Sequence, residues 1–369
     1  MTGLYVHVPF CVRKCSYCDF YSVPGRGEVM DACVEAVISE AGTYSGLCFD
    51  TLYLGGGTPS LLGAETLSRL VSGLRQATDM SGLVEATIEV NPESATPGLL
   101  QAARRLGLDR VSIGVQSLSD AELASVGRVH TADQAVAAVT RARDAGFANV
   151  SADVIVGLPG QSWPSLSTTL TGLMALALDH LSLYCLSLEP GTPLAAHPPA
   201  DLPSDDLQAD LFDQARDLLT IHGYRHYEIS NFAMPGFECR HNINYWRGWE
   251  YVGLGPAAAS HLASRRYRNR ADVHGYIDNP TGSVEQVECL PPGKKAAEEA
   301  MLRLRLLAEG LSADTLVSKY GTNHAAEVVA RLDNLVEQHM LILDDLAYRL
   351  EPSRVLTSNP IFAAVLSNE

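Results

Sequence analysis

Apolar residues follow two different spacings along the first part of the chain. Short apolar runs, typical of buried strands, occur at Leu4–Val8, Thr51–Leu54, Thr87–Val90, Arg110–Val115, Ser151–Val156 and Leu181–Ser187. Helical spacing occurs between them, in Glu28–Thr43, Ala64–Ala77, Pro97–Leu106, Thr131–Ala145 and Pro164–Leu178. This order predicts βαβ units and a parallel sheet. Because their crossovers are right-handed, the sheet curls one way, and we expect an α/β fold with a partial (β/α)6 barrel.

The pattern changes after Glu189-Pro190-Gly191. A helix is predicted at about Asp205–His222, and an aromatic and histidine-rich segment follows it. Beyond Pro291, helical spacing recurs at Lys294–Ala308, Ala313–Tyr320 and Ala325–His339. A two-stranded wing is predicted after them, at Met340–Leu350. This tail resembles a small winged-helix-like α+β domain, whose role is either packing or DNA contact. We expect a barrel over 1–235, a connecting segment over 236–290 and the C-terminal domain over 291–369.

Composition narrows the possible partners. Apolar residues make up 46% of the chain and charged residues 19%, so most of it should fold. The net charge of −16 argues against a sequence-independent nucleic-acid binder, which needs a positive surface. No basic leader and no apolar run of about 18 residues are apparent, and we expect a cytoplasmic protein without a transmembrane segment.

Unusual residues gather where the predicted strands end. Gly55-Gly56-Gly57-Thr58-Pro59 follows the second strand, and Glu89-Val90-Asn91-Pro92 ends the third. Gln116 ends the fourth strand, and Asp153 lies on the fifth. Because the carboxyl ends of parallel strands meet at one face of such a barrel, we expect the chemistry there.

Cys11, Cys15 and Cys18 follow the first strand and predict an iron–sulfur site. A [4Fe–4S] cluster normally has four thiolate ligands, so three leave one iron open. The amino and carboxylate groups of S-adenosylmethionine can chelate that iron, and an electron from the cluster can then release a 5′-deoxyadenosyl radical. The alternative is a zinc site completed by His7 or Asp19, which the spacing fits poorly. The other five cysteines are scattered, and burial is their expected role.

The triplet, the GGGTP motif and the strand pattern together resemble the radical-SAM superfamily, and most closely its branch of coproporphyrinogen dehydrogenases and haem chaperones. The resemblance covers nearly the whole chain. It implies that Tyr5 lies beside the cluster and that Gly56, Gly57 and Thr58 receive the methionine amino group. It also implies that Glu89 contacts S-adenosyl-L-methionine. Matching positions that hold this cofactor or a second copy of it are Gln116, Arg128 and Asp153.

Three features favour the haem chaperones over the dehydrogenases of porphyrin biosynthesis. Phe20 stands where the dehydrogenase pattern has a fourth cysteine. The triplet begins at residue 11, without the longer segment that precedes it in the dehydrogenase. The segment from His241 to Trp246 matches the H-N-x-x-Y-W motif of the chaperone branch. We therefore expect a haem chaperone rather than a coproporphyrinogen dehydrogenase, with oxidative decarboxylation of coproporphyrinogen III as the alternative, and whether the protein is an enzyme stays open.

The resemblance implies haem contacts at His241, Asn242, Tyr245 and Trp246. Histidine is a common axial ligand of haem iron, and aromatic side chains can pack on a porphyrin face. The alternative is that His241 and Asn242 form a hydrogen-bonded turn while the aromatic residues fill core.

The expected partners are haem and a haem-acceptor protein, of which a respiratory protein is one candidate. A dense basic run at Arg265, Arg266, Arg268 and Arg270 is a second candidate contact, because guanidinium groups suit haem propionates. That run is also compatible with a docking patch for the acceptor or with a solvated hairpin. The sequence leaves dimerisation open.

Overall fold

A curved sheet of twelve strands runs through the computed structural model, which describes residues 1–25 and 27–367. Its parallel centre consists of β1 (Thr2–Val8), β4 (Thr51–Gly56), β5 (Glu85–Val90), β6 (Arg110–Gln116), β7 (Asn149–Val156) and β8 (His180–Cys185). All residues of β6 are buried, as expected for a parallel strand covered on both faces. The predicted α/β partial barrel is confirmed.

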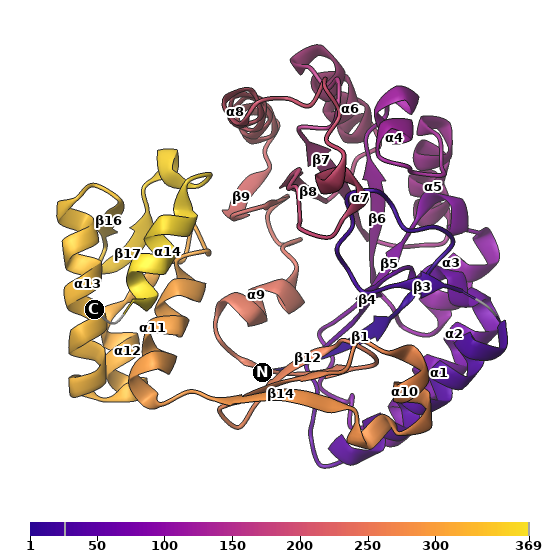
Figure 1. The fold of residues 1–369 in the computed structure, drawn as a ribbon, viewed down its shortest axis with the longest axis horizontal. Coiled ribbons are helices and arrows are strands. Elements are labelled where there is room, and N and C mark those ends of the chain that lie inside the picture. Colours follow the sequence, from indigo (N-terminus) through magenta and orange to yellow (C-terminus); the bar gives the residue numbers. More distant parts are fainter. Residues whose placement is uncertain (26, 368–369) are drawn as a thin grey trace.

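Helices cover the convex side of this sheet (Figure 1). They are α1 (Gly27–Ala41), α2 (Gly63–Ala77), α3 (Pro97–Arg105), α4 (Asp120–Ser125), α5 (Ala132–Asp144), α6 (Trp163–Ala175) and α8 (Asp205–Ile221). Local sequence starts several of them, because the hydroxyls of Thr96, Thr131 and Ser204 accept hydrogen bonds from the first-turn amides of α3, α5 and α8. Two short helices, α7 (Pro193–Ala196) and α10 (Val273–Asp278), lie in the later connections.

Further strands extend the sheet at both edges, and the apolar pattern did not predict them as strands. On one side, β11 (Glu250–Leu254) pairs with β1, and β12 (Ala259–Leu262), β13 (Arg265–Asn269) and β14 (Val284–Cys289) follow. On the other side, β10 (Asn231–Ala233) and β9 (Arg225–Glu228) follow β8. The β14 strand is exposed at every residue, so it has no apolar alternation to reveal it.

The helix α9 (Arg240–Trp246) contains the motif that begins at His241, and it lies in the hollow of the curved sheet (Figure 1). The carboxyl group of Glu85 accepts hydrogen bonds from the backbone amides of Arg240 at 3.0 Å and His241 at 2.9 Å. Glu85 therefore satisfies two of the amides that every helix leaves unpaired at its N-terminus. Since Glu85 is the first residue of β5, α9 packs at the amino end of the parallel strands.

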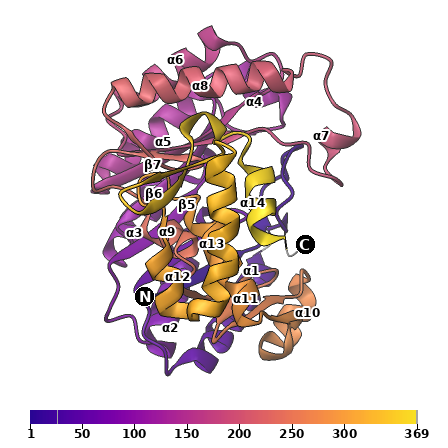
Figure 2. The same ribbon diagram turned by 90° about the vertical axis from the view of Figure 1, so that its left-hand side faces the viewer.

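The C-terminal helices α11 (Pro292–Arg303), α12 (Ala313–Tyr320), α13 (Thr322–Glu337) and α14 (Ser358–Leu366) pack together in front of α9 in Figure 2. A small sheet of β15 (Leu311–Ser312), β17 (Ala347–Leu350) and β16 (Leu341–Asp344) accompanies them. The wing-like strands lie close to their predicted positions, but α14 was not predicted. A separate apolar core runs here from Ala296 to Val365, and the domain limit near residue 291 stays a prediction.

We expect Glu85→Ala to lower the free energy of unfolding by about 2 kcal/mol, because it leaves the buried amides at the start of α9 without an acceptor. Urea denaturation of the full-length protein measures this change. Glu327→Ala removes an exposed carboxyl group from α13 and should change stability by less than about 0.5 kcal/mol. Equal effects of the two substitutions would contradict the anchoring role of Glu85.

Candidate functional site

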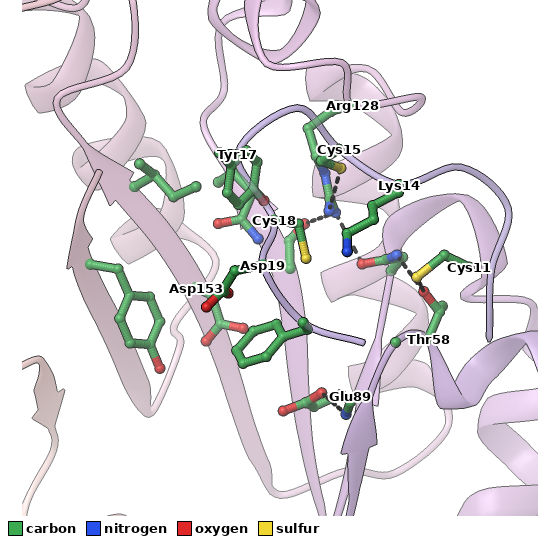
Figure 3. A pocket seen from close by; sticks show the side chains of 18 of the residues that line it. Cys11, Lys14, Cys15, Tyr17, Cys18, Asp19, Thr58, Glu89, Arg128 and Asp153 are labelled. Atoms are coloured by element: carbon green, nitrogen blue, oxygen red, sulfur yellow. Dashed lines mark hydrogen bonds between the residues drawn. The ribbon is translucent and has the colours of Figure 1, made fainter. Parts of the chain in front are cut away.

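A cavity of about 390 Å³ opens at the carboxyl ends of the parallel strands. Cys11, Cys15 and Cys18 all line it, at one side of the space shown in Figure 3, while Glu89 and Asp153 lie across from them. Seven of the eight predicted S-adenosylmethionine positions line the same cavity: Gly56, Gly57, Thr58, Glu89, Gln116, Arg128 and Asp153. The fold therefore brings the cysteine triplet and most of the predicted cofactor residues to one place.

The cysteine loop is fixed to the barrel by backbone bonds. The short strands β2 (Phe10–Cys11) and β3 (Val23–Pro24) pair and close the loop at its base. Within the loop, the Ser16 amide donates to the Val126 carbonyl at 3.1 Å, and the Ser16 carbonyl accepts from the Leu194 amide at 2.9 Å. The loop is thus held at its base and near its middle.

A polar chain connects two of the cysteines to the strand ends. Arg128 donates to the thiol sulfur of Cys15 at 3.8 Å and to the side-chain oxygen of Asn91 at 3.0 Å. Asn91 in turn donates to the Thr58 hydroxyl at 3.0 Å, and that hydroxyl donates to the sulfur of Cys11 at 3.5 Å. Sequence reasoning did not select Asn91 as a site residue, although its place directly after β5 was the available signal.

The glycine motif permits a close approach of the backbone to neighbouring groups. A Cβ atom at Gly57 would lie 2.7 Å from the carbonyl oxygen of Phe10, and one at Gly56 would lie 2.5 Å from the His7 ring. Gly56 also has a φ of 107°, which other residues rarely adopt. Glycine is therefore required for the cysteine loop to lie directly against β4.

Glu89 is a half-buried carboxyl group in the wall of this cavity. It accepts hydrogen bonds from the Tyr53 hydroxyl at 2.8 Å and from the Gly56 amide at 3.1 Å. Burial raises the pKa of Glu89 to about 7, with Asp153 adding to the effect. Burial also raises the pKa of Asp153, whose carboxyl group accepts from the Ser112 hydroxyl at 3.2 Å. A cation placed between these two acids would be stabilised electrostatically, because the site is otherwise desolvated.

Gln116 stands at an irregular strand end. Its φ is 67°, a left-handed backbone conformation that is unfavourable for residues other than glycine, and the pairing of β6 with β7 shifts register just before it. Strain of this kind persists where the surrounding structure enforces it, and it is common at functional sites. The turn directs Gln116 into the cavity wall.

Within residues 1–25 and 27–367, no three His, Cys, Asp or Glu side chains gather as they would around one metal ion. The three cysteines instead line one cavity of about 390 Å³. Three thiolates of a [4Fe–4S] cluster bind three different irons, so their sulfurs are expected around a cavity rather than at one point. The donor set, three thiols with no competing ligand at the same spot, fits such a cluster.

A second cavity of about 600 Å³ lies beside the first, and both are lined by Asp19 and Phe20. Its walls are rich in aromatic and basic side chains, including Tyr5, Tyr21, Tyr245, Trp246, Trp249, Tyr251, His7, His261, Arg266 and Arg268. We refer to it as the aromatic chamber. The structure places Tyr5 in this chamber and not in the cysteine cavity. Neither of the two cavities is lined by Asn242.

His241 is buried with both ring nitrogens occupied. Its Nδ1 lies 2.8 Å from the Thr51 hydroxyl, and its Nε2 lies 2.9 Å from the Tyr245 hydroxyl. Only 1% of His241 is exposed, and burial together with the charge of Arg110 lowers its pKa to about 3. In this geometry His241 positions Tyr245, while Tyr245 and Trp246 themselves face the chamber.

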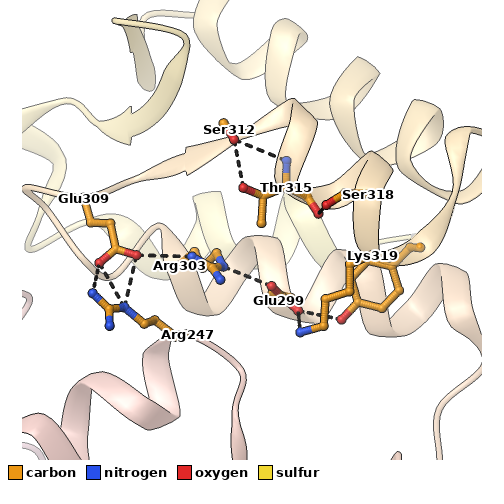
Figure 4. A network of polar contacts seen from close by, with 9 residues as sticks. Arg247, Glu299, Arg303, Glu309, Ser312, Thr315, Ser318 and Lys319 are labelled. Carbon is orange, nitrogen blue, oxygen red and sulfur yellow. Dashed lines mark hydrogen bonds and ion pairs between the residues drawn. The ribbon is translucent and has the colours of Figure 1, made fainter. Parts of the chain in front are cut away.

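The C-terminal domain forms one wall of the chamber through Glu298, Met301 and Leu302 of α11. An ion-pair network attaches this domain to the end of α9 (Figure 4). Arg247 pairs with Glu309 at 2.6 Å, Glu309 with Arg303 at 3.2 Å, and Arg303 with Glu299 at 3.0 Å. The guanidinium carbon of Arg305 also lies 4.4 Å from the ring centroid of Trp246. The domain is therefore held where it can enclose the chamber.

The basic run divides between two environments. Arg266 and Arg268 line the chamber, whereas neither Arg265 nor Arg270 does. Arg270 pairs with Glu285 at 3.6 Å, and Arg265 is exposed. Only two of the four arginines are thus placed to meet a ligand there.

Comparisons with known proteins agree with this arrangement. The family model described as the Radical SAM superfamily matches residues 5–171. The chain is 34% identical to the protein named heme chaperone HemW of Lactococcus lactis, over 99% of this chain and 97% of that one. It is 39% identical to the protein of the same name from Escherichia coli, over 76% of this chain and 72% of that one.

Among solved structures, the coproporphyrinogen III oxidase HemN of Escherichia coli, described as a radical SAM enzyme, has a similar fold. The TM-score is 0.85 at 23% identity, and the match covers 99% of this chain and 90% of that chain. This likeness concerns the fold, whereas the sequence relatives define the family. The chain belongs to the HemW family within the radical SAM superfamily.

Proposed function

We propose that this protein is a haem chaperone, which binds a [4Fe–4S] cluster, S-adenosylmethionine and haem and delivers haem to an acceptor protein. The observation that carries the proposal is the pair of adjoining cavities, one containing three thiols and the other lined with aromatic and basic groups. The names of the relatives support it, since the similar proteins of Lactococcus lactis and Escherichia coli are called heme chaperones.

In the cysteine cavity, Cys11, Cys15 and Cys18 would hold the cluster. A cluster with bound S-adenosylmethionine supplies one-electron reducing chemistry. Arg128 donates toward the sulfur of Cys15 and so stabilises negative charge there. Glu89 keeps lone pairs free on both carboxyl oxygens after its two hydrogen bonds, and would accept a hydrogen bond from the methionine amino group. Asp153 would accept hydrogen bonds from ribose hydroxyls.

In the aromatic chamber, Tyr245, Trp246 and Tyr251 would pack on the porphyrin. Large aromatic surfaces favour burial of such a ring, and the volume of about 600 Å³ falls in the usual range of ligand sites. The indole N–H of Trp246 is buried without a partner among the described residues, so it is free to donate to a ligand. These features support haem as the second ligand.

The state of the cysteine thiols supports a proposal about the cellular compartment of the protein. All eight cysteines are free thiols, as expected in a reducing compartment such as the cytoplasm. No helix in the described part of the chain is long and apolar enough to cross a membrane. We propose that haem is handed over to its acceptor in the cytoplasm.

Cys15→Ala should lower the iron content of anaerobically reconstituted protein well below about four atoms per chain, because one thiolate ligand is lost. Iron and sulfide analysis measures this loss, and the visible absorbance of the iron–sulfur cluster should fall with it. Cys48→Ala removes an exposed thiol outside the cavity and should retain full iron content. Binding of zinc in place of iron by the unsubstituted protein would refute the cluster assignment.

Affinity for S-adenosylmethionine should rise as the pH increases through about 7. Below that value Glu89 is protonated, because burial raises its pKa to about 7, and a neutral carboxyl group accepts a hydrogen bond from the methionine amino group more weakly than a carboxylate does. If only ionised Glu89 binds, affinity changes about tenfold between pH 6 and pH 8. Calorimetric titration of the reconstituted protein measures it. The Glu89→Gln variant should bind S-adenosylmethionine more weakly at pH 8, and its affinity should be nearly independent of pH. If the pH dependence of its affinity matched that of the unsubstituted protein, Glu89 would be excluded from binding.

One assay with two arms distinguishes the haem chaperone from a coproporphyrinogen dehydrogenase. Reconstituted protein receives S-adenosylmethionine, a reductant and coproporphyrinogen III in one arm, and haem followed by an acceptor apoprotein in the other. We expect haem uptake and transfer without protoporphyrinogen formation. Phe20 stands where the dehydrogenase pattern has a fourth cysteine, and it is 63% exposed at the border of the two cavities. Decarboxylation of coproporphyrinogen would overturn the proposal.

A further inference from the structure

One face of the extended sheet presents a histidine and two arginines to the aromatic chamber. In the pairing of β12 with β13, His261 lies opposite Arg266, and Ala259 lies opposite Arg268. On the other side, His261 pairs with Tyr251 of β11. Since directly paired residues and residues two apart share a face, Tyr251, His261, Arg266 and Arg268 all point the same way. The cavity lining agrees with this register.

Three histidines lie in or beside the chamber, but their ring nitrogens differ in availability. His241 uses both nitrogens, on Thr51 and Tyr245. His7 also uses both, with Nδ1 3.0 Å from the Tyr5 hydroxyl and Nε2 2.9 Å from the Tyr21 carbonyl. Neither can ligate a metal without losing a hydrogen bond in a buried site.

His261 differs because only one nitrogen is used. Its Nδ1 lies 3.4 Å from the carbonyl oxygen of Trp249, and its Nε2 has no hydrogen bond to any described residue. A carbonyl can only accept, so Nδ1 carries the proton and Nε2 keeps its lone pair. Histidines that bind metals usually donate their other N–H to a carbonyl or carboxylate in this way, which fixes the ring and the tautomer. Burial also lowers the pKa of His261, which favours the neutral ring that ligation needs.

Aromatic rings continue from His241 to His261 along this wall. The centroid of Tyr245 lies 4.9 Å from that of His241 and 4.5 Å from that of Tyr251, both in edge-to-face geometry. The Tyr251 centroid then lies 6.0 Å from that of His261. A flat ring bound through His261 would therefore meet the aromatic residues of α9 and β11, whereas His241 stands behind Tyr245.

Arg268 is the chamber arginine with free donors. The Arg266 guanidinium pairs with Glu298 and lies 3.7 Å from Glu288. Arg268 makes one hydrogen bond, from Nε to the Ala257 carbonyl at 3.1 Å, and has no ion pair with a described acid. Its two terminal nitrogens can thus bind a carboxylate. Arg268 is diagonal to His261 across the strand pair, with Cα atoms on the order of 7–8 Å apart.

We propose that His261, and not His241, is the axial ligand of haem iron in the aromatic chamber, and that Arg268 binds a propionate of the same haem. This rests on the proposed haem-carrier function and specifies how the haem lies. The iron faces β12, the porphyrin packs against the aromatic residues of α9 and β11, and a propionate points along β13.

The test compares ferric haem with metal-free protoporphyrin IX on the full-length protein. His261→Ala should weaken haem binding at least tenfold and shift the Soret band, yet leave the metal-free porphyrin unaffected, because only iron needs the ligand. Added imidazole should restore the spectrum of this variant. Arg268→Gln should weaken both porphyrins but change nothing for haem dimethyl ester, which lacks carboxylates. His274→Ala, an exposed histidine, and Arg265→Gln, an exposed arginine on β13, are the matched controls.

The outcomes distinguish this inference from the proposed function. Failure of the unsubstituted protein to bind haem would reject the haem-carrier function itself. Haem binding with an unchanged spectrum in His261→Ala would reject only the ligand assignment, and loss of the spectrum in His241→Gln with correct folding would move the ligand to His241. Should His261→Ala fold poorly by circular dichroism, His261→Met supplies another natural haem ligand, and we expect it to bind haem with an altered Soret band.

Discussion

A single buried carboxyl group organises much of this molecule. Glu85, at the start of β5, accepts the first amides of α9 and so fixes that helix inside the curve of the sheet. Because α9 is fixed, Tyr245 and Trp246 face the aromatic chamber. The C-terminal domain is then attached through Arg247 at the end of the same helix. A short helix is weak by itself, so its position depends on this anchoring.

The two cavities depend on opposite features of one sheet. The cysteine cavity uses the carboxyl ends of the parallel strands, where loops from several strands meet. The aromatic chamber instead uses a sheet face beyond the edge of the barrel, where β11 to β13 continue from β1. The cysteine loop borders both, through Asp19 and Phe20. Haem in the chamber would therefore lie next to the loop that contains Cys11, Cys15 and Cys18.

The sequence predicted those features that depend on residues close together in the chain. The parallel strands, their helices and the cysteine loop follow from apolar spacing, helix caps and strand-end motifs, and seven predicted cofactor positions line the same cavity as the three cysteines. Prediction failed for β13 and β14, because these strands are polar and largely exposed and their pairing depends on residues far along the chain. It also missed Asn91, whose contacts with Thr58 and Arg128 join the ends of β4 and β5 to the loop that follows α4.

Periodicity and residue spacing alone were enough to predict the barrel and the cysteine loop, since both depend on residues that lie close together in the chain. The sequence also singled out the motif at His241 and the arginine run, but not which atoms are free. The folded structure alone shows that both nitrogens of His241 are occupied while Nε2 of His261 is available. This could not be predicted from the sequence, because the hydrogen bond between Thr51 and His241 joins segments 190 residues apart, and no local pattern encodes such a contact.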